Sequence, residues 1–397
     1  MRHPRSLGAI AAAVALAVSL IAAQAPQDVP AADAAINGVK AKFAPDTRVA
    51  VFTVTAERSG DAVVLRGEVE DPAAKQALLT AVSAAGLPIV DQIAVLPDPV
   101  LGAETWGIVT VSVAHVRGKP SHPAEQVTEV PMGAVVRLLK KQGSWYFAQT
   151  ETENYLGFFE TAQVVPMSRD GIDAWARATK VMTTTPFAFV REQPAADAAP
   201  VSDLVAGSVL KGGQIRNGWR AVELPDGRAG FVEQAAVEGY DAWRKSRRLT
   251  PEAIEKTALQ FMGVPYLWGG TSPKGFDCSG FTKTVFRLNG VEIARDTDQQ
   301  AEQGTEVPIE KDLSQLKKGD LLFFCPSAEQ RTRITHVGIY LGNGVFIHCS
   351  GMVRRNSLVA DSPIFSDNLL KRLVRVRRFA GTASADQPHA ASAAVLR

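Results

Sequence analysis

An internal repeat of about 74 residues constrains the fold of this chain more than any other feature of the sequence. The two copies share identical residues in one register: Val116-Arg117-x-x-Pro120 with Val190-Arg191-x-x-Pro194, Gly133 with Gly207, Trp145 with Trp219 and, after a one-residue deletion, Gly157-Phe158-x-Glu160 with Gly230-Phe231-x-Glu233. So many identities are hard to obtain by chance. Each copy consists of short apolar stretches broken by Gly and Pro, which is typical of a small β-barrel. We therefore expect two barrels, at about residues 103–166 and 180–238, with Trp145 and Trp219 in their cores.

The repeated pattern, V-R-x-x-P followed by Gly, Trp and G-F, resembles bacterial SH3-like domains. The whole chain of 397 residues is long enough for about two to four domains, so the barrels account for only part of it. Its net charge of +2 gives no overall field that would attract nucleic acid. Its three cysteines exclude a disulfide scaffold and a four-cysteine zinc site.

The first 25 residues have the layout of a secretory signal peptide. Basic residues precede an apolar run that ends in small residues suited to cleavage: Arg2, His3 and Arg5, then Leu7 to Ala23, with Ala23 and Ala25 as cleavage positions. The run is about 16 residues long, which is short for a membrane span, although an uncleaved N-terminal anchor stays the alternative. We expect an exported protein, periplasmic or extracellular, that is not held at the membrane after cleavage.

The region before the repeat indicates one further small domain. Residues 26–35 are rich in Ala and Pro and are interpreted as a linker. Residues 36–97 then show two alternating strands, a helix that ends before Gly86 and a third strand. This ββαβ unit resembles the BON-like domains of bacterial envelope proteins, and no residue in it indicates chemistry.

The C-terminal third forms the last predicted domain, at residues 250–379. A basic connector at 241–249 leads into Thr250-Pro251-Glu252, a strong helix start with a capping hydroxyl and proline in the first turn. We expect that helix to end at Gly263. Residues 380–397 are a low-complexity Ala/Ser tail and are expected to be disordered.

Within this domain, Cys278 is the candidate nucleophile. The segment after it carries Phe281, Val285 and Leu288 at helical spacing, and Asn289-Gly290 ends the pattern. Cys278 is therefore predicted to begin a buried helix, where the helix dipole favours the thiolate. The free N–H groups of the first turn are suited to stabilise an oxyanion.

Two histidines on a predicted hairpin are the candidate base and its orienting partner. His336 lies on the first strand and His348 on the second, with Gly342-Asn343-Gly344 between them. A three-residue loop would pair Gly338 with His348 and put both histidines on one face, whereas a two-residue Asn-Gly turn would separate them. We predict the longer loop, so that His336 takes the thiol proton and His348 orients its imidazole.

These residues alone leave alternatives open. A buried cysteine is more often inert core than a nucleophile. A zinc ion held by Cys278, His336 and His348 is conceivable, but neither C-x-x-C nor H-E-x-x-H supports it. We predict no metal and no cofactor.

The local motifs resemble the NlpC/P60 family of cell-wall cysteine peptidases over about residues 250–379. They occur in family order: Y-x-W-G-G (Tyr266–Gly270), D-C-S-G-F (Asp277–Phe281), R-D-T-x-x-Q (Arg295–Gln300), L-x-x-G-D-L-L-F-F (Leu316–Phe324), H-V-G-I-Y (His336–Tyr340) and F-I-H (Phe346–His348). The resemblance implies a papain-like α+β catalytic domain with Cys278 as nucleophile, His336 as base and His348 as third polar residue. Ala294, where the family commonly has Pro, and Cys349, where it has a small residue, depart from the pattern.

Two SH3-like domains before this domain resemble the γ-D-glutamyl-L-diamino acid endopeptidases, which act on murein peptides. The resemblance implies that Asp296 binds the free N-terminal amine of the peptide, with Ser279 and Thr297 as neighbouring contacts. It also implies that Trp268 lines the subsite beside the scissile bond. Tyr155 is our candidate for the residue that reaches this site from the first barrel.

Three hypotheses for function follow. The first is a secreted endopeptidase that cuts the γ-D-glutamyl–diamino acid bond of murein peptides with a free N-terminal L-Ala, the diamino acid being diaminopimelate or Lys. The second is a hydrolase of intact peptidoglycan that uses its SH3-like domains as wall anchors. The third is a wall-binding protein without activity, against which the complete set Cys278, His336 and His348 argues.

Overall fold

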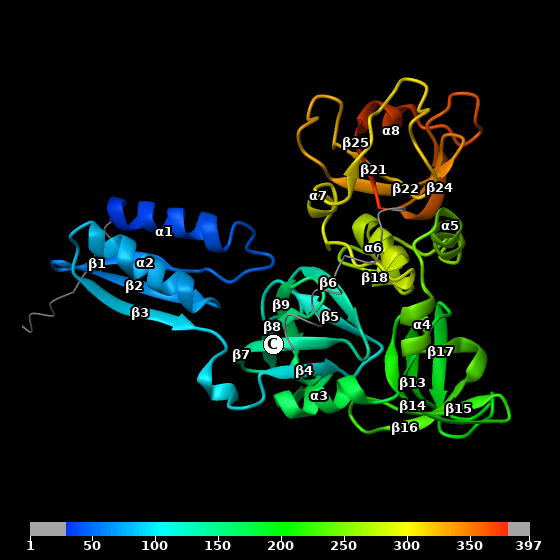
Figure 1. Ribbon diagram of the computed structural model, residues 1–397, viewed down its shortest axis with the longest axis horizontal. Helices are drawn as coiled ribbons and strands as arrows, with labels where there is room; N and C mark the ends of the chain where they lie inside the picture. Colours follow the sequence, from blue (N-terminus) through cyan, green and yellow to red (C-terminus); the bar gives the residue numbers. More distant parts are fainter. Residues whose placement is uncertain (1–28, 380–397) are drawn as a thin grey trace, which may run out of the picture.

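The computed structural model describes residues 29–379, and these form four units along the chain. In Figure 1 the N-terminal unit (blue) lies at one end, the first barrel in the middle, and the second barrel and the C-terminal domain (yellow to red) on the other side. The predicted signal peptide and the predicted C-terminal tail lie outside the described residues. Among the described residues, no helix is both long and apolar enough to span a membrane.

The N-terminal unit is larger than the sequence predicted. Its elements are α1 (Pro30–Phe43), β1 (Thr55–Ser59), β2 (Ala62–Val69), α2 (Pro72–Ala84) and β3 (Ile89–Val95). The strands form one sheet in the order β1-β2-β3, with β2 and β3 parallel. The interpretation of residues 26–35 as a linker was wrong from Pro30 onward, because Pro30 begins α1 and the apolar side chains Ala32, Ile36 and Val39 share one buried helical face.

The two repeat copies have the same topology. The first contains β4 (Trp106–Val109), β5 (Val113–Arg117), β6 (Gln126–Pro131), β7 (Val135–Gln142), β8 (Trp145–Thr150), β9 (Leu156–Glu160) and β10 (Val164–Met167). The second contains β11 (Lys180–Thr183), β12 (Phe187–Arg191), β13 (Pro200–Val205), β14 (Val209–Arg216), β15 (Trp219–Glu223), β16 (Ala229–Glu233) and β17 (Val237–Gly239). The strand orders, β10-β4-β7-β8-β9-β5-β6 and β17-β11-β14-β15-β16-β12-β13, are equivalent element by element. The repeat thus encodes the same SH3-like sheet twice.

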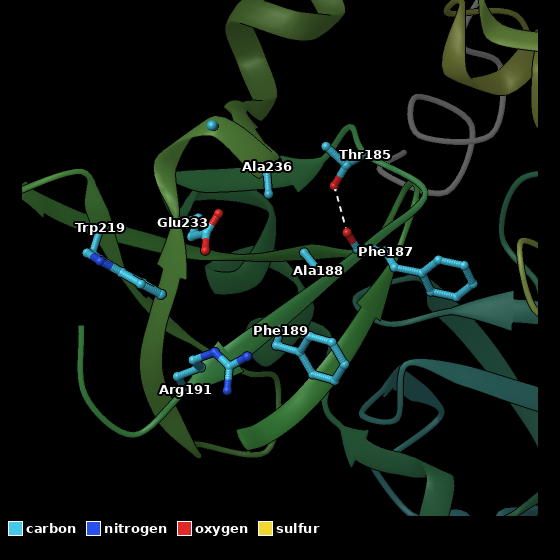
Figure 2. Close-up of a pocket in the computed structure, with 9 residues that line it drawn as sticks. Thr185, Phe187, Ala188, Phe189, Arg191, Trp219, Glu233 and Ala236 are labelled. Carbon is cyan, nitrogen blue, oxygen red and sulfur yellow. Dashed lines mark hydrogen bonds between the residues drawn. The ribbon is translucent and has the colours of Figure 1, made fainter. Parts of the chain in front are cut away.

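The repeated tryptophans differ in environment. Trp145 is buried, and the ring of His122 packs edge-on against it with centroids 5.2 Å apart. Trp219 instead lines an open hollow of about 290 Å³ on the second barrel, beside Phe189 and Arg191 (Figure 2). The prediction of a core position is therefore confirmed for Trp145 and wrong for Trp219.

Two short helices join the barrels to their neighbours. Helix α3 (Arg169–Arg177) follows the first barrel and α4 (Tyr240–Ser246) follows the second. Each buries one tryptophan, Trp175 or Trp243. Part of the basic connector predicted at 241–249 is therefore a helix that packs through Trp243.

The C-terminal domain places helices against a six-stranded sheet. Its helices are α5 (Pro251–Leu259), α6 (Cys278–Leu288), α7 (Thr297–Gln300) and α8 (Asp367–Arg372). Its strands are the small pair β18 (Thr271–Ser272) and β19 (Gly275–Phe276), and the sheet strands β20 (Thr305–Glu306), β21 (Leu321–Phe324), β22 (His336–Gly342), β23 (Val345–Ser350), β24 (Met352–Ser357) and β25 (Leu373–Arg378). The sheet order is β20-β25-β21-β22-β23-β24, and α6 packs on β22 and β23. Helix α5 is capped by Thr250 as predicted but ends at Leu259, and turns continue the chain to Gly263.

The first barrel is fixed to this domain through buried polar contacts. The Glu129 carboxylate accepts a hydrogen bond from the Thr271 N–H at 3.0 Å, and the Thr271 hydroxyl donates to the Glu129 carbonyl. A side chain at Gly269, where φ is +76°, would put its Cβ 2.3 Å from the Gln126 carbonyl oxygen. Gly269, the first glycine of the Y-x-W-G-G motif, therefore permits the close approach of the first barrel to the C-terminal domain.

Candidate active site

Cys278 is the first residue of α6, as predicted, and Asp277 caps that helix. The Asp277 carboxylate accepts the Gly280 N–H at 2.7 Å, which satisfies one free donor of the first turn. Gly280 lets the helix approach the preceding loop, because a Cβ there would lie 2.0 Å from the Gly270 carbonyl oxygen. The Cys278 side chain is 8% exposed, at the edge of the main core of the domain.

The two histidines lie on one face of the β22–β23 hairpin and contact each other. His336 Nε2 is 2.7 Å from His348 Nδ1, and His348 Nε2 is 2.9 Å from the Asn356 side-chain oxygen on β24. The chain His336–His348–Asn356 therefore holds both imidazole planes.

The register of this hairpin is as predicted, but the predicted loop is wrong. Ile339 pairs with Ile347 and Tyr340 with Phe346, in the register that faces Gly338 to His348. The connection is the two-residue turn Asn343-Gly344, with φ of +51° and +77°, as expected of a type I′ turn. A β-bulge between Tyr340 and Gly342 adds the residue that keeps the histidines on one face.

Burial favours the neutral forms of Cys278 and the two histidines. Burial and the Asp277 carboxylate raise the pKa of the Cys278 thiol to about 11, against the opposing effect of nearby hydrogen-bond donors. Burial lowers the pKa of His336 to about 3 and that of His348 to about 4. The expectation that the helix start produces a thiolate is not met in this state, because desolvation of the charged sulfur outweighs the helix dipole. The resting pair is a thiol and a neutral imidazole.

The thiol contacts Thr297 and the strand that carries His336. Cys278 Sγ lies 3.6 Å from Thr297 Oγ1, and the Val337 N–H also helps to lower the thiol pKa. Val337 follows His336 on β22, so this contact brings the base strand beside the sulfur. Burial raises the pKa of the Tyr266 hydroxyl, and the nearby Cys278 sulfur and Asp277 carboxylate add to this rise.

A buried ion pair between Arg295 and Asp277 lies at the start of α6, next to Cys278. Arg295 is 2% exposed and donates from Nη2 to Asp277 Oδ2 at 2.5 Å. Its Nη1 donates to the Ser279 hydroxyl at 3.0 Å, and its Nε reaches Thr128 of the first barrel at 2.9 Å. Ser279 is 4% exposed, so its hydroxyl is part of this buried hydrogen-bond network and does not line the open part of the site.

Asp296 and Tyr155 meet from different domains. The Tyr155 hydroxyl, on the first barrel, donates to Asp296 Oδ2 at 3.0 Å, and the Asp296 side chain keeps 24% exposure. Asp296 directly precedes Thr297, whose hydroxyl oxygen lies 3.6 Å from Cys278 Sγ. Burial raises the pKa of Asp296, while Arg295, Tyr155 and Arg48 oppose that rise.

A cation from the N-terminal unit also reaches Asp296, and nothing in the sequence indicated it. Arg48 Nη1 donates to Asp296 Oδ2 at 2.8 Å and to Asp298 Oδ1 at 2.9 Å. Asp296 is thus a carboxylate that already binds a positively charged donor.

Trp268 marks the open side of the site. Its side chain is 61% exposed, and its indole N–H donates to the Glu125 carboxylate of the first barrel at 2.8 Å. Of the predicted site residues, Asp296 and Trp268 contact the first barrel, through Tyr155 and Glu125. Cys278 contacts Thr297, and His336 contacts His348.

Four side chains that contact the predicted site residues were not among them: Asp277, Arg295, Asn356 and Arg48. A signal for Asp277 existed, since an Asp directly before a buried helix is a preferred cap. Asn356 depends on the pairing of β23 with β24, and Arg48 on the docking of a separate domain. No local sequence pattern predicts the pairing of these strands or the docking of this domain.

Among residues 29–379, no group of three His, Cys, Asp or Glu side chains is arranged to hold a metal ion. The three cysteines are free, with Cys325 and Cys349 fully buried. No disulfide joins Cys325 to Cys349.

Comparison with known proteins divides the chain in the same way as the structure. Residues 263–378 match the NlpC/P60 family, residues 116–164 the bacterial dipeptidyl-peptidase SH3 domain, and residues 56–97 the BON-like domain.

Individual relatives cover the barrels and the catalytic domain. Dipeptidyl-peptidase 6 of Lysinibacillus sphaericus is 29% identical over 279 residues, 68% of this chain and 97% of that protein. The gamma-D-glutamyl-L-lysine dipeptidyl-peptidase of Bacillus subtilis is 48% identical over 99 residues, 25% of this chain and 32% of that protein, so this match spans about a third of the relative. The crystal structure of an NlpC/P60 family protein from Bacillus cereus has the same fold, with a TM-score of 0.59 at 22% identity over 69% of this chain and 99% of that one.

Proposed function

We propose that this protein, whose residues 263–378 match the NlpC/P60 family, cuts the γ-D-glutamyl–diamino acid bond of murein peptides whose N-terminal L-Ala is free. The observation that carries the proposal is the Asp296 site. There, a partly exposed carboxylate next to the nucleophile segment binds a cationic donor and a tyrosine hydroxyl from the first barrel. The similarity to the gamma-D-glutamyl-L-lysine dipeptidyl-peptidase of Bacillus subtilis supports the same bond.

The chemistry follows from the neutral resting pair. Cys278 Sγ attacks the γ-carbonyl carbon of D-Glu while its proton passes to His336, which His348 and Asn356 hold in place. The oxyanion lies at the start of α6, where first-turn N–H groups point out of the helix. His336 then gives its proton to the leaving amine of the diamino acid, and water hydrolyses the thioester to release L-Ala-D-Glu.

Asp296 supplies the preference for a free amine. The substrate ammonium would form an ion pair with this carboxylate and hydrogen-bond beside Tyr155, while Thr297 and the exposed Trp268 border the reacting bond. A peptide whose L-Ala is still amide-linked has no charge to offer. Loss of the ion pair between the substrate ammonium and Asp296 costs about 3 kcal/mol, or roughly 10²-fold in kcat/KM.

We also propose that the protein acts outside the cytoplasm, on peptides or wall of the periplasm or cell exterior. The support is the basic start and apolar run of the first 25 residues, which has the composition of an export signal.

The proposal is tested by comparing kcat/KM for L-Ala-γ-D-Glu-diaminopimelate, its N-acetylated form and whole sacculi. We expect the N-acetylated peptide to be cut at least about 10²-fold less efficiently. Asp296→Ala should abolish this preference, while Asp367→Ala, a control at an exposed ion pair on α8, should keep it. Equal kcat/KM for the free and N-acetylated peptides would contradict the proposal and favour a hydrolase of intact peptidoglycan.

A further inference from the structure

The loop between α1 and β1 projects from the N-terminal unit onto the catalytic site. Its backbone is fixed to the first barrel, where the Leu156 N–H donates to the Arg48 carbonyl at 2.8 Å and the Gln149 side chain donates to the Val49 carbonyl at 2.9 Å. This position carries the Arg48 side chain across to α7 of the catalytic domain.

The Arg48 guanidinium is held by three carboxylates. Nε and Nη2 donate to Asp46, Nη1 and Nη2 donate to Asp298, and Nη1 also donates to Asp296. The distances lie between 2.8 and 2.9 Å. The carboxylate of Asp46 is further held by the Gln299 side chain at 2.7 Å. The loop therefore presents its cation in a defined orientation.

The oxygen that Arg48 uses is the one a substrate amine would need. Asp296 Oδ2 accepts from both Arg48 and the Tyr155 hydroxyl, which fills the two lone pairs of that atom. The other oxygen, Oδ1, lies 3.9 Å from Arg295 Nη1. An ammonium group and the Arg48 guanidinium therefore compete for the same acceptor.

We propose that the N-terminal domain regulates the peptidase through Arg48, an internal cation that occupies the amine subsite at Asp296 until substrate displaces it. This inference rests on the proposed function, because it takes Asp296 to be the amine-binding carboxylate. The exchange is balanced in charge, because one cation leaves the carboxylate as another arrives.

The way in which the domain is attached allows this displacement. Among residues 29–379, the hydrogen bonds and ion pairs that join the N-terminal unit to the catalytic domain all involve Asp46 or Arg48. The Arg48 and Asp298 side chains are 36% and 55% exposed, so water and salt screen the attraction between them. The apolar contact of the unit is with the first barrel, where Val51 and Leu96 pack on Leu139 and Leu156. The guanidinium can therefore leave the site while the domain stays attached.

The test compares KM and kcat for L-Ala-γ-D-Glu-diaminopimelate in the full-length wild type, Arg48→Gln, Arg48→Lys and Arg66→Ala. We expect Arg48→Gln to lower KM about tenfold with little change in kcat, because one charge-assisted competitor is removed. Arg48→Lys keeps the charge and should stay nearer to the wild type. Arg66→Ala removes an exposed arginine that pairs with Glu57 within the same unit and should leave KM unchanged. Added salt should lower KM of the wild type more than that of Arg48→Gln.

Two results would overturn the inference, and they can be told apart. An unchanged or raised KM in Arg48→Gln, with normal cleavage by the wild type, would reject the regulation alone and make Arg48 part of the wall of the subsite. Failure of the wild type and every variant to cut the tripeptide would contradict the proposed function and the regulation with it.

Discussion

At the scale of single residues, the candidate nucleophile lies under two opposing influences. The start of α6 and the N–H groups near the sulfur favour a thiolate, whereas burial and the Asp277 carboxylate favour the thiol. Burial prevails and raises the pKa of Cys278 to about 11, while the pKa of His336 falls to about 3. Between these values both groups are neutral in the free enzyme.

This protonation state predicts the pH dependence of Cys278 alkylation by iodoacetamide in the absence of substrate. Only the thiolate reacts, so the rate should rise about tenfold per pH unit from pH 7 to pH 10 and level off near pH 11. Mass spectrometry of the labelled protein gives the rate, and Cys278→Ala gives the background from Cys325 and Cys349, which are fully buried. A rate already constant at pH 7 would instead mean a preformed thiolate–imidazolium pair.

The reacting side chains could be found from the sequence, and their supporting partners could not. Cys278, His336 and His348 stand in motifs whose local spacing reports a helix start and a hairpin. Asn356 and Arg48 contribute through long-range contacts, across β23–β24 and across a domain junction, and no local spacing encodes such contacts.

At the scale of elements, the position of α6 depends on the absence of a side chain at Gly280. The helix start lies against the Gly270 carbonyl, which leaves no space for a Cβ between them. The loop that contains Gly270 also contains Trp268 and Gly269, which contact the first barrel. The packing of α6 against this loop therefore also affects the geometry of the junction between the two domains.

We predict that Gly280→Ala destabilises the catalytic domain by at least about 3 kcal/mol, because its Cβ would stand 2.0 Å from the Gly270 oxygen. The matched control is Gly38→Ala, an exposed position inside α1 with open space around it. That control should stabilise the N-terminal unit by about 0.5–1 kcal/mol. Thermal unfolding followed by calorimetry measures both, and equal effects of the two variants would contradict the proposed packing.

The hairpin illustrates how an element can be predicted correctly for the wrong local reason. We predicted the strand register from the need for both histidines to lie on one face. The register is correct, but a β-bulge at Leu341 produces it and not a longer loop. The residues of a turn indicate its type, whereas no residue pattern in this sequence indicates a bulge inside a strand.

At the scale of the molecule, three of the four units contribute to one site. The catalytic domain supplies Cys278 and Asp296, the first barrel supplies Tyr155, and the N-terminal unit supplies Arg48. The repeat in the sequence was sufficient to predict the barrels, because identical residues recur in one register. The N-terminal helix was missed because its Ala- and Pro-rich start has the composition of a linker, although its buried face has helical spacing.

The central claim is that Cys278 hydrolyses the γ-D-glutamyl bond of a free murein tripeptide. Mass spectrometry of the products formed from L-Ala-γ-D-Glu-diaminopimelate in water enriched in oxygen-18 tests it most directly. The account predicts free diaminopimelate and an L-Ala-D-Glu dipeptide with one heavy oxygen in its γ-carboxyl group, and no products from a folded Cys278→Ala variant. Release of free L-Ala, or turnover by Cys278→Ala, would contradict it.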